Sequence, residues 1–130
     1  MISYSAVSPE PSQTIWPLLA EPARWRRWAP HLLRTAGLGE PEVQAGRRGV
    51  VILAPGVLVP VRIVGKVPGQ EWSWTVGPVR LRHAVMAKAE HGSVVRVEVV
   101  APRPLEVAIR ATYGPLIRVF LANLVRVAGR

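Results

Sequence analysis

Residues 12–28, with the sequence SQTIWPLLAEPARWRRW, carry three of the chain's five tryptophans. Pro17 limits the first helix of this stretch to a short or kinked one, because proline lacks the N–H that a helix interior needs. Pro22 starts a second short helix, on which Trp25 and Trp28 lie three residues apart and share a face. The stretch therefore predicts two short helices whose indoles pack them against the rest of the fold, with one indole at the mouth of any cavity.

Composition limits the class of protein. The chain has 130 residues, 49% of them hydrophobic, which predicts one folded domain over residues 1–130 with a continuous core. It has no cysteine, so disulfides, thiolate metal sites and a cysteine nucleophile are excluded. No secretory pattern opens the sequence, and no apolar run approaches the roughly 20 residues that cross a bilayer. We therefore expect a cytoplasmic protein with no transmembrane segment.

The charge balance is strongly basic. Lysine and arginine number 17 against 8 acidic residues, which gives a formal net charge of +9. The arginines are scattered along the predicted strands and helices, and no helix-turn-helix, zinc-ligand or aromatic RNA-binding pattern accompanies them. The sequence therefore argues against nucleic acid as the partner. It leaves open a macromolecular partner on a basic outer face, and it is compatible with a homodimer.

Alternation of apolar and polar residues predicts an antiparallel sheet with one wet face. The strands are expected at residues 2–7, 32–38, 48–54, 57–67, 71–76, 79–90 and 93–101. Trp72 and Trp74 share one face of their strand, and His83 lies on the apolar face of the next.

The strand over residues 57–67 shows the longest alternation. Val61, Ile63 and Gly65 fall on one face, and Arg62 and Lys66 fall on the other. This pattern predicts that Lys66 lies on the wet face of the sheet.

The C-terminal part of the chain is helical. From Leu105 onward, apolar residues that include Tyr113 and Phe120 recur at helical spacing. Gly114 and Pro115 predict a kink in this helix or its division into two. The element order is therefore β-α-α, then six strands, then a long helix, which is an α+β fold.

This order resembles the helix-grip fold of the SRPBCC superfamily, also called START-like or Bet v 1-like. The local signals, read in order, are Trp16 in a proline-led first helix, Pro22…Trp25-x-x-Trp28, Gly46-x-x-Gly49 at the start of a strand, Pro68-Gly69-x-x-Trp72, and Tyr113-Gly114. The chain is most similar to the small bacterial polyketide cyclase/dehydrase-type proteins. The resemblance implies a curved antiparallel sheet wrapped around the C-terminal helix, with a cavity for a lipid, polyketide or similar hydrophobic metabolite. It also implies, as a third class, a protein that binds a macromolecular partner.

The ligand-binding residues expected in such a cavity are Trp72, Trp74, His83, Tyr113, Val61, Ile63 and Phe120. His83 could act as a general acid or base, or orient a ligand carbonyl, and the alternative, which weighs more, is a hydrogen-bonded core histidine. Tyr113 could offer its hydroxyl to a ligand or be a core aromatic residue. A cyclase or dehydratase would use these two residues as its acid and base. The mainly apolar inner faces favour binding over catalysis.

No metal or cofactor site is expected. His31, His83 and His91 fall in different elements, and the chain contains no aspartate. No glycine-rich phosphate loop and no Gly-x-Ser-x-Gly elbow is present. We therefore expect neither a metal ion nor a nucleotide cofactor.

Overall fold

The computed structural model describes residues 1–88 and 91–130 and places them in a seven-stranded sheet with helices on one side. The strands are β1 (Ile2–Ser8), β2 (Leu32–Ala36), β3 (Arg48–Leu53), β4 (Val57–Val67), β5 (Glu71–Val76), β6 (Val79–Ala87) and β7 (Ser93–Val100). The helices are α1 (Ser12–Ala20), the short 3-10 helix η1 (Pro22–Arg27) and α2 (Arg103–Ala128). The predicted α+β order is confirmed. The part of the sixth predicted strand at Ala89 and Glu90 lies outside the described residues.

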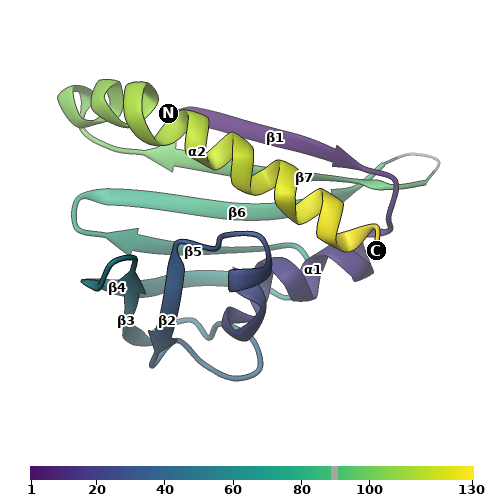
Figure 1. Cartoon of the computed structure of the whole chain (residues 1–130), viewed down its shortest axis with the longest axis horizontal. Helices are drawn as coiled ribbons and strands as arrows, with labels where there is room; N and C mark the ends of the chain where they lie inside the picture. The colour runs from purple at the N-terminus through teal and green to yellow at the C-terminus, as the bar shows by residue number, and fades with distance from the viewer. Residues whose placement is uncertain (89–90) are drawn as a thin grey trace.

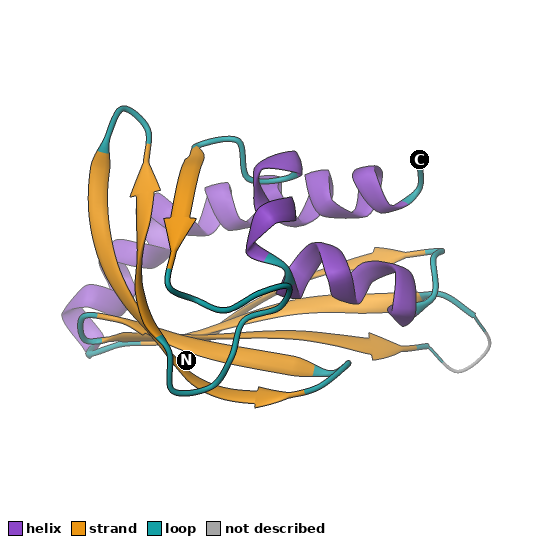
Figure 2. Cartoon of the chain, turned by 90° about the horizontal axis from the view of Figure 1, so that it is seen from below, coloured by secondary structure: helices purple, strands orange, loops and turns teal. Residues whose placement is uncertain are grey.

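The sheet is antiparallel throughout, in the order β1-β7-β6-β5-β4-β3-β2, and it curves around the helices (Figure 1). Figure 2 shows α1 and α2 on its concave side. One row of the inner face passes from Trp72 to His83, then to Val97 and Tyr4, each paired with the next. All four are buried, because cross-strand partners point to the same face and this face meets the helices. The curved sheet and long C-terminal helix are those of the helix-grip fold.

A bulge in β4 reverses the alternation after Ile63. The pairing with β5 shifts between Ile63 and Gly65, which leaves Val64 as an extra residue. Lys66 is consequently paired with Trp72 on the inner face. The prediction that Lys66 lies on the wet face, with Gly65 in the row of Ile63, is wrong. A single inserted residue moves every later side chain to the other face, and alternation in the sequence does not reveal where it occurs.

Glu42, between β2 and β3, gives the inward Lys66 an ionic partner. One Glu42 carboxylate oxygen lies 2.9 Å from Lys66 Nζ, and the other accepts a 3.0 Å hydrogen bond from Trp16 Nε1. These contacts join α1, the β2–β3 connection and β4. Trp16 therefore fastens α1 through a polar bridge as well as by packing.

The last four carbonyls of α1 have no partner within the helix, as at the end of any α-helix. Groups from outside the helix satisfy all four. Two backbone groups donate: Glu21 N–H to the Pro17 oxygen and Val43 N–H to the Ala20 oxygen, both at 3.0 Å. Three indoles donate the rest: Trp28 Nε1 to the Leu18 oxygen (2.8 Å), and Trp25 Nε1 and Trp72 Nε1 to the Leu19 oxygen (2.9 and 3.0 Å). Three indoles thus complete the end of a nine-residue helix, which explains why this short element is well anchored.

Helix α2 runs without interruption through Gly114 and Pro115, so the predicted division into two helices is wrong. Pro115 lies on the exposed side, where water can bond the carbonyl that loses its partner. Gly114 is buried, and a Cβ there would overlap the hydroxyl of Tyr4. Glycine at this position therefore lets β1 approach the helix closely.

Candidate functional site

A cavity of about 490 Å³ lies between the inner face of the sheet, η1 and α2. Valine, leucine, isoleucine, alanine and aromatic side chains form almost all of its wall. Its described lining residues include no arginine, lysine or glutamate, although the chain carries a net charge of +9. The volume is within the range of sites for small organic ligands. The cavity is therefore an apolar chamber inside a basic protein.

Six of the seven predicted ligand-binding residues line this cavity. They are Val61, Trp72, Trp74, His83, Tyr113 and Phe120. Ile63 is fully buried and is not among the lining residues. Tyr113 is 45% exposed, so it lies where α2 meets solvent rather than deep under the helix.

Four aromatic rings form one cluster at the sheet side of the cavity. Trp72 stacks on Trp25 and on His83, with centroid distances of 5.3 and 3.9 Å. Trp74 meets all three rings edge to face, at 5.1 to 5.6 Å. Such pairs stabilise a core beyond the area that they bury. The cluster therefore gives the cavity a rigid aromatic wall.

Trp72 contributes to this wall mainly as a structural residue. It is 1% exposed, it carries two stacked rings, and its Nε1 donates to α1. Little of its ring is free to stack on a ligand. Trp74 is partly exposed, and its buried Nε1 has no hydrogen-bond partner among the described residues.

His83 is 7% exposed and lies between the aromatic cluster and the cavity. Burial lowers its pKa to about 4, because the charged ring loses hydration, and the polar backbone of Trp72 opposes this only in part. The ring is therefore neutral at neutral pH. A group with so low a pKa is a weak base and is not a proton donor near pH 7.

His31 is a lining residue that sequence reasoning did not assign to the cavity. Its ring stacks on Phe120 of α2 at 4.4 Å, and burial lowers its pKa. Asn123 of α2 also donates to the Trp28 carbonyl at 3.3 Å. These contacts link α2 to the segment between α1 and β2. The position of His31 directly after Pro30 carries no periodic signal, so only the fold shows that it faces the cavity.

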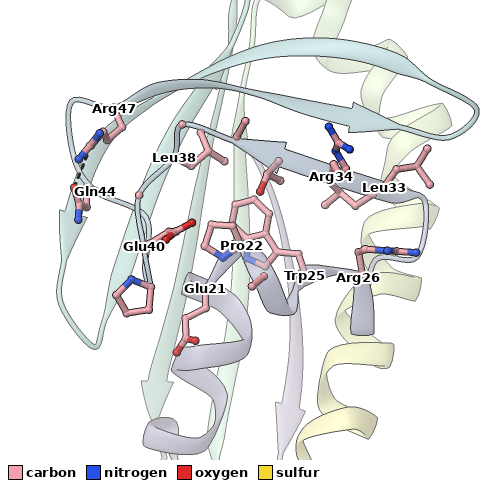
Figure 3. Close-up of a pocket in the computed structure, with 17 residues that line it drawn as sticks. Glu21, Pro22, Trp25, Arg26, Leu33, Arg34, Leu38, Glu40, Gln44 and Arg47 are labelled. Atoms are coloured by element: carbon pink, nitrogen blue, oxygen red, sulfur yellow. Dashed lines mark hydrogen bonds between the residues drawn. The ribbon is translucent and has the colours of Figure 1, made fainter.

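A second hollow, of about 1110 Å³, lies on the other side of Trp25, between η1, β2 and the β2–β3 connection. Its lining is mixed and includes the charged residues Arg26, Arg34, Arg47 and Glu40 beside apolar ones. Figure 3 shows Trp25 at its centre with these side chains around it. Trp25 lines both hollows and so forms part of the wall between them.

Two other features are not found in the part of the chain that the structure describes: a metal-ligand cluster and a membrane-spanning helix. No group of histidine, aspartate or glutamate side chains there could hold a metal ion. None of its helices combines the length and apolar character that crossing a membrane requires.

Solved structures with the same fold are numerous and distant in sequence. No family model matches the chain, and no curated protein matches it. Protein MLL2253 from Mesorhizobium loti superposes with a TM-score of 0.74 at 15% identity, covering 96% of this chain and 93% of that one. Ara h 8.0201, of the Bet v 1 family, gives 0.66 at 12% identity, covering 96% and 97%.

DynU16, from the dynemicin biosynthetic locus, gives a TM-score of 0.74 at 17% identity. The match covers 96% of this chain and 45% of DynU16. The chain therefore spans less than half the length of that protein. At these identities the comparisons show the fold, and that fold is Bet v 1-like.

Proposed function

We propose that residues 1–130 form a single SRPBCC-like domain that binds a small hydrophobic molecule, such as a lipid, a polyketide or a similar metabolite, between the sheet and α2. The observation that carries this proposal is the 490 Å³ chamber with its apolar wall. Transfer of apolar ligand surface out of water yields about 25 cal/mol per Å², before the costs of association. A wall of this kind therefore supplies affinity without any charged contact.

The alternative is an enzyme of the polyketide cyclase/dehydrase type that uses His83 and Tyr113. Both residues line the cavity, and a protein from a biosynthetic locus shares the fold. The low pKa of His83 argues against it, because proton transfer at neutral pH is fastest for groups that titrate near that pH. Binding without turnover is the better-supported function.

Native mass spectrometry of gently purified protein, followed by organic extraction, tests the proposal. We expect an apolar molecule that stays bound through purification and is released by solvent. The matched variants are Ala108→Trp and Ala111→Trp, both at exposed positions of α2. Ala108 lines the cavity and Ala111 does not.

Ala108→Trp adds an indole at a position that lines the chamber and should reduce or abolish the bound mass, whereas Ala111→Trp carries the same helix-propensity cost and should retain it. Equal retention by both variants would contradict binding in this cavity. Turnover of an extracted molecule by the wild type, lost in His83→Ala and Tyr113→Phe, would favour the enzyme instead.

A second candidate function is contact with an anionic macromolecule through the outer face of the sheet. Arg48 lies directly opposite Arg62, and Arg80 lies in the same cross-strand row. Like charges in such pairs destabilise a sheet. None of the three has a carboxylate partner among the described residues, whereas Arg82 on the same face contacts two glutamates. An uncompensated row of this kind suits a partner that brings its own negative charge.

Elution from heparin at increasing salt tests this second function. The Arg48→Gln, Arg62→Gln double variant should elute at lower salt than a control, Arg103→Gln with Arg110→Gln, that removes the same charge from α2. Elution of both variants at the same salt would attribute retention to net charge alone.

A further inference from the structure

Trp74 differs from the other four tryptophans in its hydrogen bonding. Trp16 donates to a carboxylate, and Trp25, Trp28 and Trp72 donate to backbone carbonyls of α1. Trp74 Nε1 is buried and has no acceptor among the described residues. A buried donor without a partner is costly, and native structures contain few of them. The Trp74 N–H therefore needs an acceptor that the described part of the protein does not supply.

Two histidine nitrogens share this condition. Nδ1 of His83 and Nδ1 of His31 are buried and have no partner among the described residues. Both residues line the same cavity as Trp74. His83 is more than nine-tenths buried, and its ring is 5.6 Å from that of Trp74 between centroids. Three of the four buried side-chain polar atoms without a partner among the described residues thus belong to residues of this chamber, and the fourth is the hydroxyl of Tyr4, which does not line it.

The charge of the cavity wall limits which ligand groups can form hydrogen bonds with these buried polar atoms. The described lining holds no lysine or arginine, so a carboxylate or phosphate would enter without a counter-ion. Transfer of an unpaired charge into an apolar environment is far more costly than transfer of a hydrogen-bonded neutral group. The chamber therefore selects against anionic head groups, despite the basic exterior.

From these observations we propose that the cavity selects an uncharged, mainly apolar ligand that carries a carbonyl or hydroxyl oxygen, and that this oxygen accepts a hydrogen bond from Trp74 Nε1. An indole N–H is only a donor, so its partner must be an acceptor. A neutral imidazole offers one donor and one acceptor nitrogen, so His83 or His31 can bond a hydroxyl as well as a carbonyl. This inference rests on the proposed function and assigns Trp74 as its specificity-determining residue.

Isothermal titration calorimetry with four naphthalene probes tests it. The probes are naphthalene, 2-acetylnaphthalene, 2-naphthol and 2-naphthoate, which share a ring system and differ in the polar group. The wild type should bind the ketone and the naphthol about five- to tenfold more tightly than naphthalene, and 2-naphthoate more weakly than either. Trp74→Phe keeps a ring and loses the N–H, so this variant should bind the ketone and the naphthol no more tightly than it binds naphthalene.

Trp16→Phe is the control, because it removes an indole that does not line the cavity. It should leave all four affinities unchanged. An unchanged preference in Trp74→Phe, or 2-naphthoate binding as tightly as the ketone, would overturn the inference and leave the proposed function standing. Failure of every probe to bind would contradict the proposed function itself.

Discussion

Acidification from about pH 7.5 to about pH 5 should destabilise the folded protein through His83. In the unfolded chain the ring has its ordinary pKa of 6.5, and in the folded chain burial lowers the pKa to about 4. Between these values the unfolded state binds a proton that the folded state does not. The stabilising contribution of the neutral ring is therefore complete above pH 6.5 and is lost as the pH falls toward 4.

The magnitude follows from the shift. One pKa unit corresponds to about 1.4 kcal/mol, so the full shift amounts to roughly 3 kcal/mol. Only part of it is lost by about pH 5, where linkage gives a decrease of about 2 kcal/mol in the free energy of unfolding. His83 is 7% exposed, and no charged side chain lines the cavity beside it in the described residues, so solvent and counter-ions offset little of this loss.

Urea unfolding at a series of pH values, followed by far-UV circular dichroism, measures the effect. The comparison is between the wild type and His83→Phe, which keeps an aromatic ring against Trp72 and cannot titrate. Glutamates and His31 remain in both proteins, so the difference between the two slopes isolates His83. His91→Gln, which removes an exposed histidine, is the control. Equal slopes in the wild type and His83→Phe would refute the assignment of a neutral, desolvated ring.

Further substitutions test the packing of the fold, each by urea or thermal unfolding. Gly114→Ala should cost about 1–3 kcal/mol, because the added methyl overlaps the Tyr4 hydroxyl, and Tyr4→Phe should restore part of that loss. A stable Gly114→Ala protein that gains nothing from Tyr4→Phe would contradict this contact. Gly49→Ala should cost about 3 kcal/mol or more, because its methyl overlaps the Ala36 carbonyl oxygen and separates β2 from β3. Wild-type stability of this variant would disprove the close approach of the two strands at Gly49. Trp28→Phe should cost about 1 kcal/mol or more, because it leaves a carbonyl of α1 without its indole donor, and an unchanged midpoint would argue against this cap.

Local patterns were sufficient to predict the order of elements and most strand boundaries. Turns marked by Gly and Pro pairs separate strands with regular alternation. Each of these two signals depends only on residues that are close together in the sequence. The predicted strand over residues 57–67 has the bounds of β4. The bulge at Val64 escaped prediction because the residues on both sides alternate equally well in either register.

Features that depend on contacts between distant residues could not be predicted. Trp72 caps a helix that ends 52 residues earlier in the chain, and no spacing rule connects the two. His31 reaches the cavity because α2 brings Phe120 against it. The continuity of α2 at Pro115 likewise depends on which side of the helix faces water. Four of the predicted residues that line the cavity, Val61, Trp72, Trp74 and His83, lie on regularly alternating strands, and alternation is a signal that the sequence carries locally.

The pairing of β1 with β7 has a consequence for how the chain is made. β1 forms its ladder with a strand synthesised much later, and Ile2 lies opposite Val99. At ribosomal rates of about 5–20 residues per second, the first strand waits roughly 5–20 seconds for its partner. During that interval its backbone donors and acceptors and the side chain of Tyr4 are available to other nascent chains. Closure of the sheet is therefore the step at which molecular chaperones would have most to protect.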